Sequence, residues 1–282
     1  MKYSKEERRR ICERIGANPD SFVLTHEANK LSVNYRTLRR WIDDYNKNPD
    51  IRQKDSIVMV IPDLHCPFEH PDALDFLKFI RLKFKPTDII CLGDEADFHA
   101  FSRFPTDPDG YSPGTEAQKT IEHLIPFYVE FPELKVCVSN HTIRPKKLMK
   151  ECGIPAAWVA SYSMMLNAPD GWEWADHYVI DDVRYMHGDL GRGGKNGWCA
   201  NSEVFHMSCV VGHWHSRAGV YYDSKMFNLN AGCLIDASCY AFDYAKGSEK
   251  KPNLGCGLVI DGEVAHFIPL RVDEDNRWIG RL

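Results

Sequence analysis

Short apolar runs recur through the body of the chain, and each run stops at polar residues. The runs are rich in β-branched residues and too continuous for strands that face solvent on one side. We therefore expect strands that are covered on both faces. The predicted strands are Ile57–Ile61, Ile89–Leu92, Val136–Val138, Val183–Met186 and Ser208–Val211.

Between these runs the apolar spacing changes to that of helices. Pro71–Phe84 places apolar residues three and four positions apart, which predicts an amphipathic helix. Two further segments, 116–130 and 144–167, are expected to be helical in part. The body is therefore expected to alternate strands with helices.

Two connections have recognisable features. Asp261-Gly262 lies between two apolar runs and predicts a tight hairpin turn. The Pro- and Asp-rich stretch Phe98–Thr115 is expected to be a long loop. Its residues His99 and Arg103 are candidates for the rim of a cleft.

The first fifty residues follow a different pattern. Residues 4–16 predict a helix, with Ser4 at its start and Gly16 at its end. Ala28 and Leu31 fit one face of a second, short helix. The inward face of a third helix is predicted to contain Val33, Leu38, Trp41 and Ile42. The intervening step from Leu31 to Asn34 predicts a tight corner, and residues 46–50 read as a linker.

Composition limits the class of protein. The chain has 282 residues, of which 44% are hydrophobic and 27% charged, enough for one large domain and a small one. It contains no run of about 18 uncharged apolar residues, so we expect no membrane span. Without a secretory signal, the ten cysteines are expected to be reduced and mostly buried in a cytoplasmic protein.

Charge is distributed unevenly. Residues 1–54 hold thirteen Lys/Arg and eight Asp/Glu, a net charge of +5, whereas the remainder holds 22 and 32, a net charge of −10. The basic segment favours an anionic partner. The acidic body remains compatible with a phosphate substrate, because bound divalent cations would reverse the local sign.

The residues that close the predicted strands are metal-ligand types. Carboxyl ends of strands in α/β sheets are where sites assemble, so these residues are expected at one edge. Mixed Asp, Asn and His ligands suit borderline divalent metals, with manganese expected and iron, zinc, nickel or cobalt as alternatives. The closing groups are Asp63-Leu64-His65, Gly93-Asp94, Asn140-His141, His187-Gly188 and Gly212-His213-Trp214-His215.

Their spacing has a stereochemical reason. Residues two apart at a strand end point to the same side, so Asp63 and His65 can converge on one ion. His213 and His215 can likewise reach a pair of ions. Asp94 can bridge two ions about 3.5–4 Å apart, which would clamp a phosphate and activate water.

The ordered set D-x-H, G-D-x-x-D, N-H, H-G and G-H-x-H resembles the calcineurin-like metallophosphoesterase superfamily over about residues 56–235. The resemblance implies a four-layer αββα sandwich of two packed sheets flanked by helices. It places one metal on Asp63, His65 and His215, and the other on Asn140, His187 and His213, with Asp94 bridging. Asn230-Ala231-Gly232 is similar to the short Asn-x-Gly step of the family.

The resemblance also assigns catalytic roles. His141 would be the general acid that protonates the leaving oxygen, and Arg144 would contact the phosphate. Asp97 would hydrogen-bond to metal ligands and orient them without contacting the metal itself. Two positions depart from the family pattern: Ser139 replaces the glycine before Asn-His, and Thr142 replaces the acidic residue after it. The missing carboxylate puts the orientation of His141 in question.

The N-terminal segment resembles a helix–turn–helix of transposases and of phage DNA-packaging or regulatory proteins. The exposed face of its second motif helix would reach phosphates and base edges. The simpler alternative is a helical cap or oligomerisation module with solvated arginines. The candidate DNA-binding residues are Asn34, Tyr35, Arg36, Arg39 and Arg40.

Together these features predict two domains, a small all-α domain at 1–50 and a metallophosphoesterase domain at 51–282. The predicted function is two-metal hydrolysis of a phosphodiester, in nucleic acid, by a metal-activated hydroxide with His141 as acid. One alternative is a phosphomonoesterase acting on phosphoprotein or a small metabolite. The other is a DNA-binding scaffold with an inactive phosphoesterase fold.

Overall fold

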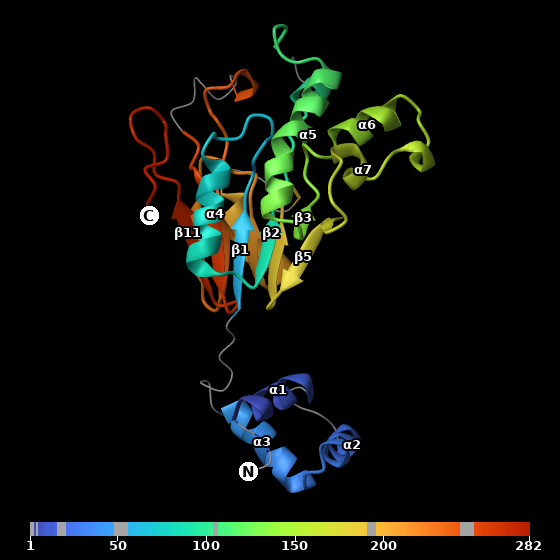
Figure 1. Ribbon diagram of the computed structural model, residues 1–282, viewed down its shortest axis with the longest axis vertical. Helices are drawn as coiled ribbons and strands as arrows, with labels where there is room; N and C mark the ends of the chain where they lie inside the picture. Colours follow the sequence, from blue (N-terminus) through green and yellow to red (C-terminus); the bar gives the residue numbers. More distant parts are fainter. Residues whose placement is uncertain are drawn as a thin grey trace. The chain divides into compact units, whose positions relative to one another are not determined.

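The computed structural model describes residues 3, 5–15, 21–47, 56–103, 107–190, 196–242 and 251–282. The chain divides into two compact units, Met1–Asp55 and Ser56–Leu282, each with its own apolar core (Figure 1). The expected helix ends at Ser4 and Gly16 lie outside the described residues. So does the expected domain boundary at residues 50 and 51.

The first unit consists of three helices. They are α1 (Lys5–Ile15), α2 (Ser21–Leu31) and α3 (Tyr35–Lys47). The four residues predicted to face inward from the third helix and its corner all belong to this core, with Leu38 and Ile42 fully buried. Three residues, 32–34, connect α2 to α3, as the tight corner predicts.

The second unit contains two sheets. The six-stranded sheet has the order β11-β10-β1-β2-β3-β4, and the five-stranded sheet has the order β5-β6-β7-β9-β8. The strands of the first sheet are β1 (Ile57–Ile61), β2 (Asp88–Cys91), β3 (Leu134–Cys137), β4 (Trp172–Ala175), β10 (Gly255–Ile260) and β11 (Val264–Pro269). Those of the second sheet are β5 (His177–Ile180), β6 (Val183–Met186), β7 (Ser208–Val211), β8 (Gly219–Asp223) and β9 (Met226–Asn230).

The alternation of side chains along β1 explains how the layers pack. Val58 and Val60 point toward the second sheet, where they join Tyr185 and Phe227 in one core. Met59 and Ile61 point the other way, into a core shared with helices. β1 is therefore covered on both faces, as its continuous apolar run predicts.

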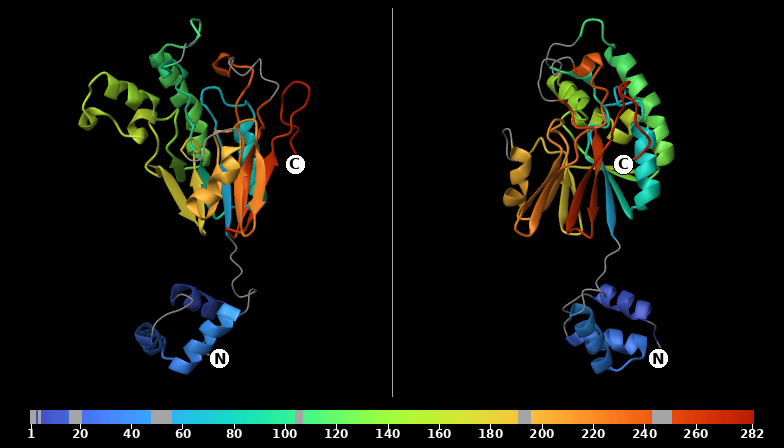
Figure 2. Two further views of the ribbon diagram at one scale, coloured as in Figure 1. Left: turned by 180° about the vertical axis from the view of Figure 1, so that it is seen from behind. Right: turned by 90° about the vertical axis from the view of Figure 1, so that its left-hand side faces the viewer.

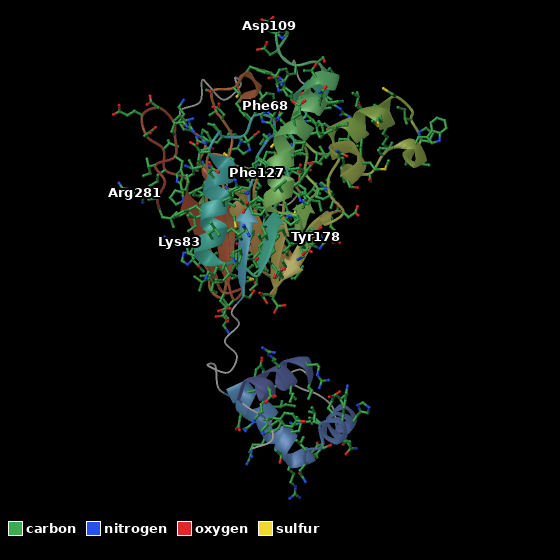
Figure 3. The ribbon with its side chains drawn as sticks, in the orientation of Figure 1. Phe68, Lys83, Asp109, Phe127, Tyr178 and Arg281 are labelled. Carbon is green, nitrogen blue, oxygen red and sulfur yellow. The ribbon has the colours of Figure 1, made fainter. Side chains whose placement is uncertain are left out.

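Helices cover the outer faces of both sheets (Figure 2). Phe127 of α5 is buried against the first sheet, whereas Lys83 of α4 is exposed (Figure 3). On the second sheet, α8 packs against β7 and β9. The helices are α4 (Ala73–Phe84), α5 (Pro113–Glu130), α6 (Arg144–Glu151), α7 (Tyr162–Leu166) and α8 (Asn201–Phe205). The predicted four-layer αββα sandwich with a small all-α N-terminal unit is thus confirmed.

Several predicted elements are confirmed, and one needs correction. The hairpin around Asp261-Gly262 joins antiparallel β10 and β11. The stretch Phe98–Thr115 is only partly a loop, because it contains the 3₁₀ helix η2 (His99–Phe101) and the first turn of α5. Ser112 accepts a hydrogen bond from the amide of Thr115 and so begins α5 earlier than periodicity indicates.

Strand direction brings the polar ends together. β1, β2 and β3 pair in parallel, and so do β6 and β7. Their carboxyl ends therefore lie along the same side of the two packed sheets. Seven of the ten cysteines are buried within the units, as expected of small apolar residues. None of the helices described is both long and apolar enough to cross a membrane.

Candidate metal centre

Four of the predicted ligands form a tight cluster. Asp63 and His65 follow β1, Asp94 follows β2, and His215 follows β7. One potential ligand atom from each lies within 4.8 Å of the others. Asp63, His65 and Asp94 are buried, and His215 is partly buried. Three separate strands are needed to assemble this group.

Asp94 lies between two histidines from different sheets. Its Oδ2 is 3.3 Å from Nε2 of His65 and 3.4 Å from Nε2 of His187. His187 Nε2 is also 2.8 Å from Oδ1 of Asn140. One carboxylate oxygen therefore adjoins both predicted ligand groups, which is the position that a bridging ligand requires.

The hydrogen bonds of the imidazoles indicate which nitrogens carry lone pairs. Nδ1 of His65 lies 2.5 Å from Oδ1 of Asp97, and Nδ1 of His187 lies 3.1 Å from the carbonyl oxygen of Leu92. Both acceptors favour a proton on Nδ1, which leaves the Nε2 lone pair facing Asp94. Lone pairs that face one another at this range repel unless a proton or a metal ion lies between them.

The spacing suits ligands of a divalent ion. Ligand atoms at about 2.0–2.2 Å from a metal lie about 3 Å from one another when their bonds are at right angles. Asp63 offers a further sign, since its Oδ1 is buried without a hydrogen-bond partner among the described residues. A Cβ at Gly212 would come within 2.1 Å of that oxygen, so glycine is required beside it. These residues fit a bound metal.

His213 completes the predicted set from the side of the second sheet. Its ring packs edge-on against that of His187, with centroids 5.1 Å apart, and its amide donates to Oδ2 of Asp63 at 2.8 Å. Oδ2 of Asp63 is also 3.0 Å from Nε2 of His215. His213 is exposed, unlike the other six predicted ligands. All seven therefore gather at one place.

The electrostatics of the cluster favour a positive charge. Burial opposes ionisation of Asp63 and Asp94, but the adjacent histidines outweigh burial and lower the pKa of both carboxyls. Burial lowers the pKa of His65, yet Asp94 and Asp97 overcome it and raise that pKa to about 10. The carboxylates thus generate a negative potential that attracts either a proton or a metal ion.

Three predicted ligands have an unusual backbone. His65, Asp94 and His213 adopt φ values of 55°, 50° and 65°, in the left-handed region. Non-glycine residues in this region are uncommon and tend to cluster at functional sites. The strained backbone turns their side chains toward the centre immediately after each strand ends.

Asp97 and Arg144 hold His141 from both sides. Nδ1 of His141 lies 2.8 Å from the carbonyl oxygen of Asp97 and 3.0 Å from its Oδ1. Arg144 lies on the opposite side, with Nη2 2.9 Å from Nε2 of His141, and its Nη1 donates to the carbonyl oxygen of Asp97 at 3.0 Å. Arg144 is therefore engaged by His141 and the main chain in this structure.

A chain of hydroxyl groups occupies the two positions where the sequence departs from the family pattern. Ser139 Oγ accepts from the amides of Asp94 and Thr142, at 2.9 and 3.1 Å, and so donates its own proton to Thr142 Oγ1 at 2.7 Å. Thr142 in turn donates to Oε2 of Glu95 at 2.9 Å. Trp174 donates to the other oxygen of Glu95 at 2.9 Å.

The Glu95 carboxylate therefore lies against Thr142, the position at which the family pattern has an acidic residue. It is fully buried, and burial raises its pKa to about 7. The sequence reasoning missed this residue, although Glu95 directly follows Asp94. Only the position of Thr142 opposite Glu95 shows the connection.

Asn230 supports the loop that carries His213 and His215. Its side-chain amide donates to the carbonyl oxygens of Trp214 and Arg217, at 2.8 and 2.9 Å, and its Oδ1 accepts from the amide of Gly232 at 3.1 Å. The predicted Asn-x-Gly step therefore has a structural role behind the ligand loop.

The candidate DNA-binding residues lie around the start of α3. Tyr35, Arg36, Arg39 and Arg40 are exposed. Asn34 lies just before the helix, where its Oδ1 accepts from the amide of Arg36 at 2.8 Å, so it serves as a cap. Arg39 pairs with Asp43 at 3.4 Å.

Comparison with solved structures finds chains that are similar to this one at 12–13% identity. Vps29 of Chaetomium thermophilum is 13% identical with a TM-score of 0.38, over 79% of this chain and 93% of its own. Vps29 of Cryptosporidium parvum is 13% identical with a TM-score of 0.37, over 72% and 83%. A chain named "putative diadenosine tetraphosphatase" is 12% identical with a TM-score of 0.37, over 76% and 94%.

No family model and no curated protein matches the sequence.

Proposed function

We propose that this chain is a metal-dependent phosphoric ester hydrolase of the calcineurin-like metallophosphoesterase type, and that it cleaves a phosphodiester in nucleic acid. One observation carries the hydrolase part: a single oxygen of Asp94 lies 3.3 and 3.4 Å from the Nε2 atoms of His65 and His187. Such an oxygen between two ligand groups supports a two-metal centre.

The ligand groups are those expected from the resemblance. Asp63, His65 and His215 would hold one divalent ion, and Asn140, His187 and His213 the other, with Asp94 shared. Ions held there would supply positive charge to phosphate oxygens and lower the pKa of nearby water. Manganese remains the expected ion, because the donors mix carboxylate, amide and imidazole.

His141 is the proposed proton donor to the leaving oxygen. The Asp97 carboxylate, 3.0 Å from Nδ1, fixes the orientation of the imidazole. In this structure Arg144 donates to Nε2 of His141 at 2.9 Å. Phosphate oxygens accept hydrogen bonds from a guanidinium more strongly than an imidazole nitrogen does, so substrate would draw Arg144 away from His141. Nε2 could then take a proton from water and pass it to the leaving oxygen.

The test compares three substrates with manganese-treated protein: bis(p-nitrophenyl) phosphate, p-nitrophenyl phosphate and labelled DNA. We expect cleavage of the diester and of DNA, and loss of both in Asp94→Asn and His141→Ala. Turnover of the monoester alone would favour the phosphomonoesterase alternative. No turnover with manganese bound would favour the scaffold alternative.

A second proposed activity is nucleic-acid binding by the first unit. Its support is the exposure of Tyr35, Arg36, Arg39 and Arg40 on one helix of a unit with its own core. In the full chain, Arg36→Ala with Arg40→Ala should weaken DNA binding and reduce the slope of log affinity against log salt by about 2. An unchanged slope would refute this docking role.

A further inference from the structure

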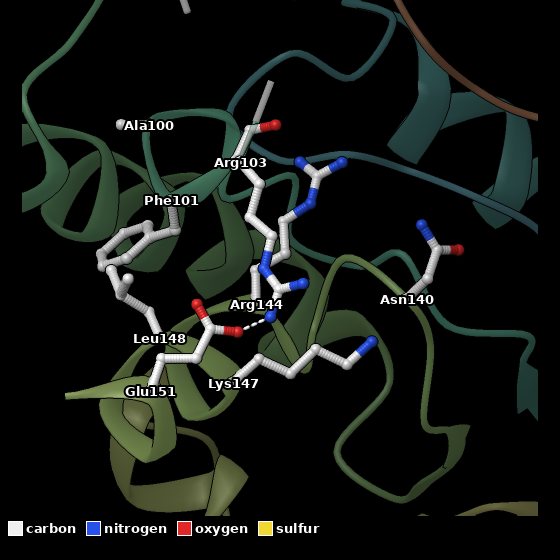
Figure 4. Close-up of a pocket in the computed structure, with 9 residues that line it drawn as sticks. Ala100, Phe101, Arg103, Asn140, Arg144, Lys147, Leu148 and Glu151 are labelled. Atoms are coloured by element: carbon white, nitrogen blue, oxygen red, sulfur yellow. Dashed lines mark ion pairs between the residues drawn. The ribbon is translucent and has the colours of Figure 1, made fainter. Parts of the chain in front are cut away.

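A cavity of about 310 Å³ lies beside the metal centre (Figure 4). The end of η2 forms one side, from Ala100 to Arg103, and α6 forms the other, from Arg144 to Glu151. Asn140, a predicted metal ligand, also lines it. The cavity therefore begins where the scissile phosphate would lie.

The lining combines two kinds of surface. Ala100, Phe101 and Leu148 form an apolar part, whereas the charged part contains Arg103, Arg144, Lys147 and Glu151. Three cations and one anion give this small region a net positive charge, within a unit whose sequence is acidic overall. Figure 4 shows Lys147 extending toward Asn140.

The two surfaces differ in how firmly their groups are held. Phe101 packs edge-on against Phe98, with ring centroids 5.4 Å apart, and the η2 turn beneath it is fixed by Glu116. The carboxylate of Glu116 accepts from the amides of His99 and Ala100, both at 2.6 Å. The η2 side of the apolar wall is therefore preformed, whereas Leu148, Arg103 and Lys147 are exposed side chains.

We infer that this cavity binds the nucleoside next to the scissile phosphate, with its base against Phe101 and Leu148 and its second phosphate at Arg103 and Lys147. This rests on the proposed function, which places the first phosphate at the metal centre. An aromatic face beside cations is how proteins bind single-stranded nucleic acid without reading sequence. A simple phosphomonoester would use neither the apolar wall nor cations beyond the centre.

The ion pair between Arg103 and Glu151 gives the inference a second, independent prediction. Glu151 competes with a phosphate for Arg103, and both side chains are solvent-exposed, so the pair is easily broken. Removal of the carboxylate should therefore improve binding of a ligand with two phosphates. A residue with a merely structural role in α6 would not produce tighter binding.

The test measures dissociation constants by calorimetry on the manganese-treated full chain, with thymidine 3′,5′-bisphosphate, thymidine and inorganic phosphate as probes. The bisphosphate is checked as intact afterwards, and folding is checked by circular dichroism. We expect Phe101→Ala and Lys147→Ala to weaken bisphosphate binding about tenfold. Phe101→Leu, which keeps the apolar packing, should weaken it less, and Glu151→Gln should tighten it about threefold.

Lys150→Ala is the matched control, because Lys150 lies on the same helix, is exposed and does not line the cavity. It should bind the bisphosphate as the unmodified chain does. The inference is overturned if Phe101→Ala and Lys147→Ala bind it equally well, or if inorganic phosphate binds as tightly as the bisphosphate.

If the proposed function is wrong, the expected results differ from those that would overturn the cavity inference. The unmodified chain would then leave bis(p-nitrophenyl) phosphate uncleaved, while the cavity variants would still differ in nucleotide binding. Binding of a single-stranded tetranucleotide distinguishes a nucleic-acid strand from a free nucleotide as the ligand of the cavity. Tighter binding than the bisphosphate supports a nucleic-acid strand, and equal binding supports a free nucleotide in the same subsite.

Discussion

The metal centre and the cavity beside it share Asn140 but are built differently. In the centre, each buried imidazole is fixed by a second contact, His65 by Asp97 and His187 by the Leu92 carbonyl. In the cavity, the cations Arg103 and Lys147 are exposed at the rim. Ligand geometry for a metal must be held closely, whereas groups that select a substrate can vary with little cost to the fold.

The largest effect is expected at the centre itself. Asp63→Asn removes a buried charge whose Oδ1 has no hydrogen-bond partner among the residues described, so metal binding should weaken. We expect diester hydrolysis to fall by about 10³-fold or more, since Lewis-acid stabilisation contributes several kcal/mol. Steady-state kinetics and manganese content by mass spectrometry would measure both. The control is Asp182→Asn, an exposed position where manganese content and rate should not change.

The next largest effect is expected for the hydrogen-bonded residues that position Asp94 without binding the metal. Glu95→Gln should disturb the hydroxyl chain through Thr142 to Ser139, and with it the backbone of Asp94. We expect kcat/KM to fall about 10- to 100-fold. The matched control is Glu173→Gln on β4, where the side chain is exposed. A Glu95→Gln protein that keeps its rate within twofold would show that the chain has no positioning role.

A smaller effect is expected in the cavity, and it should depend on the substrate. Phe101→Ala should lower the ratio of kcat/KM for thymidine 5′-(p-nitrophenyl phosphate) to that for bis(p-nitrophenyl) phosphate by about tenfold, because only the first carries a base. An Asp63→Asn protein should lose both activities together. Equal losses on both substrates in Phe101→Ala would mean that the cavity acts on the centre rather than on the nucleoside.

The smallest effect concerns a charged contact outside both regions. Asp72 pairs with Arg277 and accepts from the amide of Trp278 at 2.8 Å. The Arg277 guanidinium, together with this amide, outweighs burial and lowers the pKa of Asp72 to about 2. The stabilisation is therefore present above the unfolded pKa of about 3.9 and is lost as the pH falls toward 2.

Asp72→Asn should accordingly lower the thermal midpoint by about 2–4 °C at pH 7 and by less at pH 3, with no change in hydrolysis. Calorimetric scans of both proteins at the two pH values would measure the difference. The same difference at both pH values would contradict the assigned charge.

The predictions that succeeded depend on local patterns. The predicted limits of β1, β6 and β7 are correct to the residue, and in each of these strands all residues but at most one are buried. The strands that were missed, β4, β5, β8 and β9, contain exposed positions or polar residues. In β5, for example, exposed and partly buried residues alternate from His177 to Ile180. Short edge strands of this kind give a weak periodic signal.

The sequence by itself determined which residue types end each strand, and hence the seven candidate ligands. It also identified Ser139 and Thr142 as departures from the family pattern. The tertiary structure alone decided that Asp94 lies between His65 and His187, and that Glu95 meets Thr142 across 47 positions of the chain. It also decided that η2 and α6 enclose a cavity beside Asn140. The physical reason is that apolar periodicity and strand ends are local properties of the chain, whereas these contacts exist only once parallel strands and two packed sheets bring distant segments together.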